Sequence, residues 1–206
     1  MLNQCLELKL GITLKTPPMT IPNPPLQKAQ ALLRQYIEDD EIQKHCEATQ
    51  RKALQIAQQL SVKITVNFDL VGIGALLHDI GRARTHDVTH GYVGGQILEL
   101  YEYSPAVVKI VERHVLGGFT AEEAVLLGLP ERSFIPETWE EKIVCVADKL
   151  GIYDWDGITQ PQSWLEEMEN RFSELKKRYG ASEPFFSSME RAKHFAVAMI
   201  RLTSLK

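Results

Sequence analysis

The sequence has few of the features that mark the common special classes of protein. Its three cysteines, Cys5, Cys46 and Cys145, lie far apart and form no C-x-x-C pair. This spacing argues against a disulfide scaffold and a cysteine-based zinc site, and it favours a reducing compartment. No apolar run reaches the roughly 18 residues that a membrane-spanning helix needs. The N-terminus also shows no basic segment followed by an apolar one. The sequence therefore predicts a cytoplasmic protein.

An excess of positive charge is also absent. The chain holds 23 Lys and Arg against 27 Asp and Glu, which gives a formal net charge of -4 at pH 7. Domains that bind nucleic acid generally carry a basic patch or stripe, so the composition gives no clear nucleic-acid footprint. With 206 residues, of which 44% are hydrophobic, the chain is long enough to form one domain with its own core.

Proline is concentrated near the N-terminus, where residues 16–25 read TPPMTIPNPP. So many prolines are incompatible with a regular helix or a central strand. We therefore interpret residues 1–25 as an N-terminal appendage and linker, with no visible chemistry. Residues 26–206 are predicted to form one helical domain, in which the motifs described below occupy about residues 40–152.

From residue 26 onward, the apolar residues recur at helical spacing. One apolar stripe runs along residues 42–60. The segment from Asn67 to Gly81 is apolar nearly all round, so we expect a central helix that Gly81 ends. Residues that favour helix N-termini precede the later helical segments; they are Thr89, Ser104, Thr120, Thr138 and Ser163. Since no strand pattern follows residue 26, the sequence predicts an all-α bundle.

Six imidazoles and carboxylates stand beside inward-facing stripes or at helix ends. A buried carboxylate costs several kcal/mol, roughly, unless it is paired or binds a cation. Helical bundles build metal sites from such side chains on neighbouring helices. Mixed imidazole and carboxylate ligands favour iron, manganese, nickel, cobalt or zinc, and the sequence does not choose among them. The six candidate ligands are His45, His78, Asp79, His90, His114 and Asp148.

Each of these residues taken alone has an ordinary explanation. His45 is compatible with a core or surface histidine, and His114 with a residue that favours the negative end of a helix dipole. Asp148 is compatible with a surface ion pair to Lys142 or Lys149. When the six residues are considered together, a metal site explains them better than the separate ordinary explanations do, because it accounts for the placement of nearly every histidine.

The order of these residues resembles the H…HD…D order of the HD-domain superfamily of metal-dependent phosphohydrolases. The segment LLHDIGR, residues 76–82, is similar to the H-D-I-G-[KR] signature of that family. The resemblance covers roughly residues 40–152. It implies four core ligands, and it implies one or two divalent transition-metal ions, with His90 and His114 available for the second ion. The four core ligands are His45, His78, Asp79 and Asp148.

The resemblance implies a phosphomonoesterase or phosphodiesterase that acts on a nucleotide or other small phosphate ester through a metal-activated water. Asp79 would bridge the metals or position the nucleophile. Arg82, which stands where many members carry lysine, would bind the phosphoryl oxygens together with Arg84. The leaving oxygen would be stabilised by the second metal or by a protonated histidine such as His86. The predicted catalytic residues are thus Asp79, Arg82 and His86.

Two other functions remain open on the sequence. The domain could sense or bind a nucleotide without turnover, or it could be a di-iron oxygenase of the same fold. Four aromatic residues could stack on a base, although we expect them in the core. They are Trp155, Trp164, Phe185 and Phe186. The sequence leaves the oligomeric state open.

Overall fold

The computed structural model describes residues 26–151, 160–180 and 183–204, which form nine α-helices and one short 3-10 helix and contain no strand. The predicted all-α fold is confirmed. The predicted appendage, residues 1–25, and Trp155 lie outside the described residues. In chain order the helices are α1 (Leu26–Tyr36), α2 (Asp40–Leu60), α3 (Phe68–Leu77), η1 (Ile80–Ala83), α4 (His90–Leu100), α5 (Pro105–Arg113), α6 (Ala121–Leu126), α7 (Trp139–Ala147), α8 (Trp164–Tyr179) and α9 (Phe185–Ser204).

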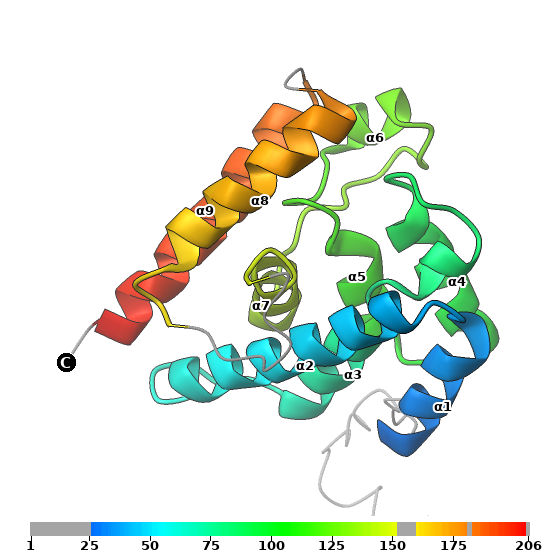
Figure 1. Cartoon of the computed structure of the whole chain (residues 1–206), viewed down its shortest axis with the longest axis horizontal. Coiled ribbons are helices and arrows are strands. Elements are labelled where there is room, and N and C mark those ends of the chain that lie inside the picture. Colours follow the sequence, from blue (N-terminus) through cyan, green and yellow to red (C-terminus); the bar gives the residue numbers. More distant parts are fainter. Residues whose placement is uncertain (1–25, 152–159, 181–182, 205–206) are drawn as a thin grey trace, which may run out of the picture.

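Helix α7 occupies the centre of the bundle. It packs against α2, α3, α5 and α9, and Figure 1 shows it nearly end-on with these helices around it. Helix α3 is also central, as its sequence predicts, because every residue from Val71 to Leu77 is buried. These two helices supply apolar surface in nearly all directions, so the bundle is organised around them.

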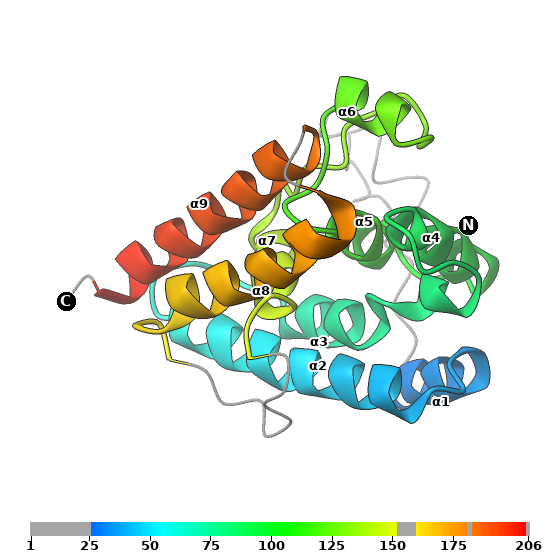
Figure 2. The ribbon, with the colours of Figure 1, turned by 45° about the horizontal axis from the view of Figure 1, so that its top comes forward.

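Helices α8 and α9 run side by side and cover one side of the bundle. Figures 1 and 2 place this pair opposite α1 and α4. Helix α9 contacts α7 and α2, and α8 contacts α9. Trp164, at the start of α8, is fully buried, whereas Phe186 is 44% exposed. Within the described segments, no helix is both long enough and apolar enough to cross a membrane.

Most of the predicted helix starts are confirmed in atomic detail. Asn67 Oδ1 accepts a hydrogen bond from the backbone N–H of Leu70 at 3.1 Å. Thr120 and Glu123 form a reciprocal capping box, in which each side chain accepts from the other's backbone N–H. The Ser104 and Thr138 side chains also cap their helices, α5 and α7.

Helices α4 and α8 begin directly after Thr89 and Ser163, as predicted, but the caps expected from these two side chains are wrong. Neither side chain accepts a hydrogen bond from its helix. Asp87 Oδ1 instead accepts from both the backbone N–H and the hydroxyl of Thr89, at 2.7 and 2.5 Å. The Ser163 hydroxyl donates to Gln160 O at 3.0 Å. Both residues have helical backbone angles, whereas a capping residue usually has extended ones. At each helix start, the side chain instead bonds to a residue that precedes it.

The prediction that Gly81 ends the central helix is also wrong. Helix α3 ends at Leu77, and Gly81 lies in η1. A Cβ atom added at Gly81 would lie 1.9 Å from His90 O, so only glycine allows η1 to approach α4 this closely. Gly94 and Gly95 of α4 serve the same purpose against α5, where added Cβ atoms would lie 2.8 Å from Val111 Cγ1 and 2.5 Å from Glu112 Cγ.

Two glycines of α3 provide a matched test of this packing. A Cβ at Gly74 would lie 2.5 Å from Ile110 Cγ2, whereas one at Gly72 would lie 3.6 Å from Leu54 Cδ2, an ordinary contact. We expect Gly74→Ala to lower the free energy of unfolding by about 1–3 kcal/mol through overpacking. Gly72→Ala should leave it unchanged or raise it by up to about 1 kcal/mol, because alanine favours helix.

Urea denaturation followed by far-ultraviolet circular dichroism measures both changes. Equal effects of the two substitutions would contradict the close packing of α3 on α5.

Candidate metal centre

The six predicted ligands come together at one place in the fold. His45 comes from α2, His78 from the end of α3, and Asp79 follows it directly; the others come from α4, α5 and the end of α7. Three overlapping groups of residues place ligand atoms within 4.8 Å of one another. These groups are His45 with His78 and Asp79; His78 with His114 and Asp148; and Asp79 with His90 and His114.

Three helix C-termini point at this cluster. His78 is the C-cap of α3, His114 that of α5, and Asp148 that of α7. The C-terminus of a helix carries a partial negative charge from its unpaired carbonyl groups. Three such ends meeting at one point favour a cation there, in addition to any charge on the side chains.

Hydrogen bonds to the backbone fix the tautomers of three histidines. Each Nδ1 atom faces the carbonyl oxygen three residues earlier, at 2.7 Å for His78, 2.5 Å for His90 and 2.7 Å for His114. A carbonyl oxygen can only accept, so each Nδ1 must be the donor. In a neutral imidazole, Nε2 then carries a lone pair, which is the state that binds a metal.

These Nε2 atoms face one another in two pairs. His45 Nε2 lies 3.2 Å from His78 Nε2, and His90 Nε2 lies 3.1 Å from His114 Nε2. The fixed tautomers of His90 and His114 give this pair facing lone pairs, which do not bond to each other, so a proton or a metal ion must lie between them or beside them. The donor set therefore fits a cation at each pair.

Asp79 stands between the two histidine pairs. Its Oδ2 lies 3.8 Å from His45 Nε2 and 3.6 Å from His78 Nε2, while its Oδ1 lies 3.1 Å from His90 Nε2 and 3.5 Å from His114 Nε2. Oδ1 is buried and makes no hydrogen bond of good geometry with the described residues. One carboxylate thus presents one oxygen to each pair, an arrangement that fits two ions sharing a ligand.

Asp148 does pair with a lysine, but in the interior. Its Oδ2 lies 2.6 Å from Lys149 Nζ, and its Oδ1 lies 2.9 Å from His45 Nε2. Lys149 is 3% exposed and also donates to His114 O at 2.9 Å. The alternative of an ion pair between Asp148 and a lysine is therefore right about the pair with Lys149, but the pair lies in the interior and not at the surface. The sequence named Lys149 only as a surface partner, because a lysine beside a turn is ordinarily solvated.

Charges around the cluster keep both carboxylates ionised. Burial acts to raise the pKa of Asp79, but the charges of His78 and Arg82 hold it well below its usual value. Burial likewise opposes ionisation of Asp148, yet the charge of Lys149 and the bond from His45 hold its pKa well below the usual value. The carboxylates therefore remain anionic ligands across the physiological range of pH.

The histidines respond differently to burial. Burial acts to lower the pKa of His78, but the charge of Asp79 and the hydrogen bond to Asp148 raise it above the usual value. For His114, burial dominates and lowers the pKa to about 3. His114 is thus a neutral imidazole near pH 7, as a metal ligand must be.

The other predicted residues lie around this cluster in different ways. Arg82 Nε lies 2.6 Å from Asp79 Oδ2, so its guanidinium is held at the cluster by an ion pair. Arg84 and His86 are exposed. A narrow cleft of about 30 Å³ opens onto the cluster, and its lining includes Arg82 but neither Arg84 nor His86. Their predicted roles stay predictions.

One residue that lines the cleft was not indicated by the sequence. Arg171 of α8 lines it together with Lys149. The surrounding segment is an amphipathic helix with many charges, a pattern that does not distinguish one arginine from the next.

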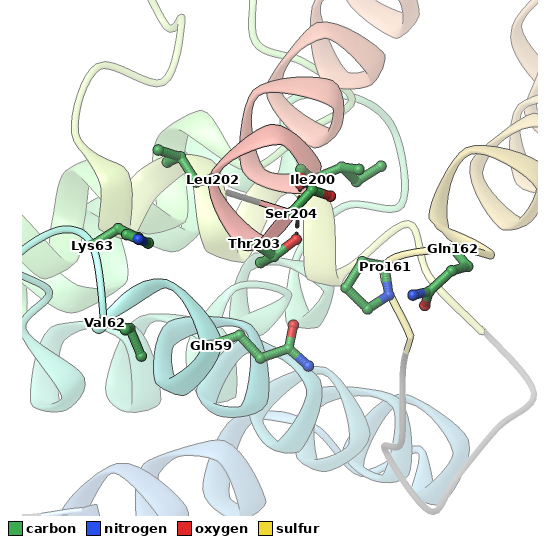
Figure 3. Close-up of a pocket in the computed structure, with 9 residues that line it drawn as sticks. All are labelled: Gln59, Val62, Lys63, Pro161, Gln162, Ile200, Leu202, Thr203 and Ser204. Carbon is green, nitrogen blue, oxygen red and sulfur yellow. Dashed lines mark hydrogen bonds between the residues drawn. The ribbon is translucent and has the colours of Figure 1, made fainter. Parts of the chain in front are cut away.

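A larger cavity of about 590 Å³ lies at the other end of α2, between that helix, residues 161–162 and the end of α9 (Figure 3). Among the described residues that line it, none is a histidine, a cysteine or an acidic residue. Within the described part of the chain, the groups of three or more potential metal ligands all lie in the cluster.

A comparison with protein families finds a match to the HD domain over residues 42–151. An uncharacterised protein of Methanocaldococcus jannaschii is 36% identical over 159 residues, which cover 77% of this chain and 88% of that protein. A tRNA (cytidine(56)-2'-O)-methyltransferase of Picrophilus torridus is 39% identical over 140 residues, 68% of this chain. The match spans 39% of the methyltransferase, so the methyltransferase name describes a longer protein of which this chain resembles one part.

Among solved structures, the HD domain of the L. monocytogenes phosphodiesterase PgpH in complex with cyclic-di-AMP matches 87% of this chain and 98% of that chain. The TM-score is 0.45 and the sequence identity is 14%. A similarity of this degree does not indicate that the two proteins share a substrate.

Burial of His114 predicts how the stability of the metal-free protein depends on pH. The pKa of this imidazole is about 3 in the folded chain and about 6.5 in an unfolded one. Between these values the unfolded chain binds a proton that the folded chain does not. The contribution of His114 to stability is therefore complete above about pH 6.5 and is lost progressively as the pH falls toward about 3.

Urea denaturation of chelator-treated protein at pH 7.5 and pH 5 measures this effect in the wild type and in His114→Gln. The wild type should lose more stability on acidification than the variant, because glutamine does not titrate. An identical loss in both proteins would argue against a buried neutral imidazole.

Proposed function

Since this chain belongs to the HD domain family, we propose that it is a metal-dependent phosphohydrolase and that the buried cluster is its active site. The family supports phosphohydrolase chemistry in general, and the roles of individual residues are our proposal. The proposed metal ligands are His45, His78, Asp79, His90, His114 and Asp148.

The observation that carries this proposal is the position of Asp79 between two histidine pairs. Each carboxylate oxygen faces a different pair of Nε2 atoms, and the oxygen facing His90 and His114 lacks a hydrogen bond of good geometry. A buried anion in this position is stable only when cations or donors satisfy it. Two divalent ions sharing Asp79 would satisfy both oxygens at once.

Bound divalent ions would supply Lewis acidity toward a phosphoryl group and a nucleophile drawn from water. The protein's own groups prepare the site for them. The carbonyl groups of Ala75, Asp87 and Val111 hold three imidazoles with their Nε2 lone pairs inward. Lys149 holds the Asp148 carboxylate and the end of α5 in place.

The proposed substrate is a nucleotide or another small phosphate ester. Arg82 supports this choice, because its guanidinium lies in the lining of the cleft beside the proposed ligands, and arginine binds phosphate oxygens with directed hydrogen bonds. Arg84 and His86 are more exposed and outside that lining. Contributions from them would require a substrate that extends beyond the cleft.

A panel of nucleotides and nitrophenyl phosphates, assayed with manganese, iron or nickel, tests the proposal. We expect release of phosphate or alcohol by the wild type. Asp79→Asn should bind less metal, measured by plasma mass spectrometry, and should lose turnover by a factor of at least about 100. The matched control is Asp69→Asn, which removes an exposed carboxylate from the first turn of α3.

Three outcomes would contradict the proposal. Full activity in Asp79→Asn would show that the cluster is not needed for hydrolysis. Nucleotide binding without product release would indicate a sensing domain. Bound iron with a redox-dependent absorption band, and no phosphate release, would indicate an oxygenase.

A further inference from the structure

Helix α8 forms a wall of the cleft that opens onto the cluster. Arg171 and Leu175, one helical turn apart, both line it. The same lining includes Arg82 and three of the proposed ligands, His90, His114 and Asp148. Helix α8 lies outside residues 42–151, the extent of the family match. A segment beyond the matched domain therefore contributes a cation to the proposed active site.

The guanidinium of Arg171 is incompletely satisfied in the structure. Its Nε is buried and has no hydrogen-bond partner among the described residues. Its ion pair with Glu174 spans 3.6 Å, and the Glu174 side chain is 47% exposed. An exposed pair at this distance contributes little, about 0–1 kcal/mol. The Nε atoms of Arg113 and Arg191 are likewise without a partner among the described residues, but of these three arginines Arg171 alone lines the cleft, where its Nε is a donor available to a ligand.

The other cations of the cleft are already engaged with protein oxygens. Arg82 Nε is bound to Asp79, and Lys149 Nζ is bound to Asp148 and to His114 O. Arg171 therefore carries the positive charge in this lining that is least neutralised by a protein carboxylate. Its planar guanidinium can also donate two parallel hydrogen bonds to one phosphate.

The volume of the cleft limits what part of a substrate can enter. About 30 Å³ is room for about two water molecules, which is comparable to one phosphoryl group and favours that group over a nucleobase. We therefore expect the organic part of the substrate to lie toward the mouth of the cleft. An internal phosphodiester would have to send two substituents out of this narrow space, whereas a phosphomonoester sends out one.

We propose that Arg171 is a substrate-binding residue that holds the terminal phosphate of a phosphomonoester together with Arg82. This inference rests on the proposed function and assigns its substrate class. It also gives α8 a role in specificity, since two residues of this helix line the cleft.

Calorimetric titration of inorganic phosphate into the protein loaded with stoichiometric manganese tests the role of Arg171 directly. Arg171→Ala should weaken phosphate binding roughly tenfold to a hundredfold, the effect of losing a charged hydrogen bond. Arg171→Lys should retain part of the affinity, because it keeps the charge but not the planar pair of donors. Lys177→Ala is the matched control, since it removes the same charge from an exposed position of α8.

Metal content and circular dichroism should be the same in all four proteins. In assays, Arg171→Ala should raise the KM for 4-nitrophenyl phosphate by a similar factor and should affect bis(4-nitrophenyl) phosphate less. Unchanged phosphate affinity in Arg171→Ala, or no phosphate binding by the wild type, would overturn the assignment. A wild type that prefers the diester would overturn the substrate class. Phosphate binding that depends on Arg171, without hydrolysis of any ester, would instead refute only the proposed function.

Discussion

The centre depends on one repeated hydrogen bond, from a histidine Nδ1 to the carbonyl oxygen three residues before it. In His78 and His114 this bond occupies a carbonyl that the end of α3 or α5 leaves without a partner. The same bond that completes the helix end fixes the tautomer of the imidazole and directs Nε2 into the cluster. A single side chain in each case thus completes the helix end and presents a nitrogen that could bind a metal.

Close packing of glycines then brings these side chains within reach of one another. Gly81 allows η1 to lie against the first residue of α4, where a Cβ atom would collide with His90 O. Gly94 allows the same helix to approach Val111 of α5. Because η1 follows Asp79 directly, these contacts set the 3.1 Å separation between Asp79 Oδ1 and His90 Nε2. Larger residues at either glycine would separate the shared carboxylate from one of its histidine pairs.

The sequence predicted the all-α fold, the family and most helix starts, because each depends on local patterns of apolar residues, caps and the spacing of the HD motif. It did not predict that α3 ends at Leu77, since that end is set by His78 and by contacts between η1 and α4. Nor did it indicate the hydrogen bonds that Asp87 accepts from Thr89, the burial of Lys149 or the place of Arg171 in the cleft. These features arise from packing between segments distant in sequence, which periodicity does not report.

The most direct test of the account is anomalous scattering from crystals of the manganese-loaded protein. Two peaks should appear on either side of the Asp79 carboxylate, one beside the Nε2 atoms of His45 and His78 and the other beside those of His90 and His114. A map with no peak at Asp79, or with manganese bound only elsewhere on the protein, would contradict the claim that this cluster is a metal centre.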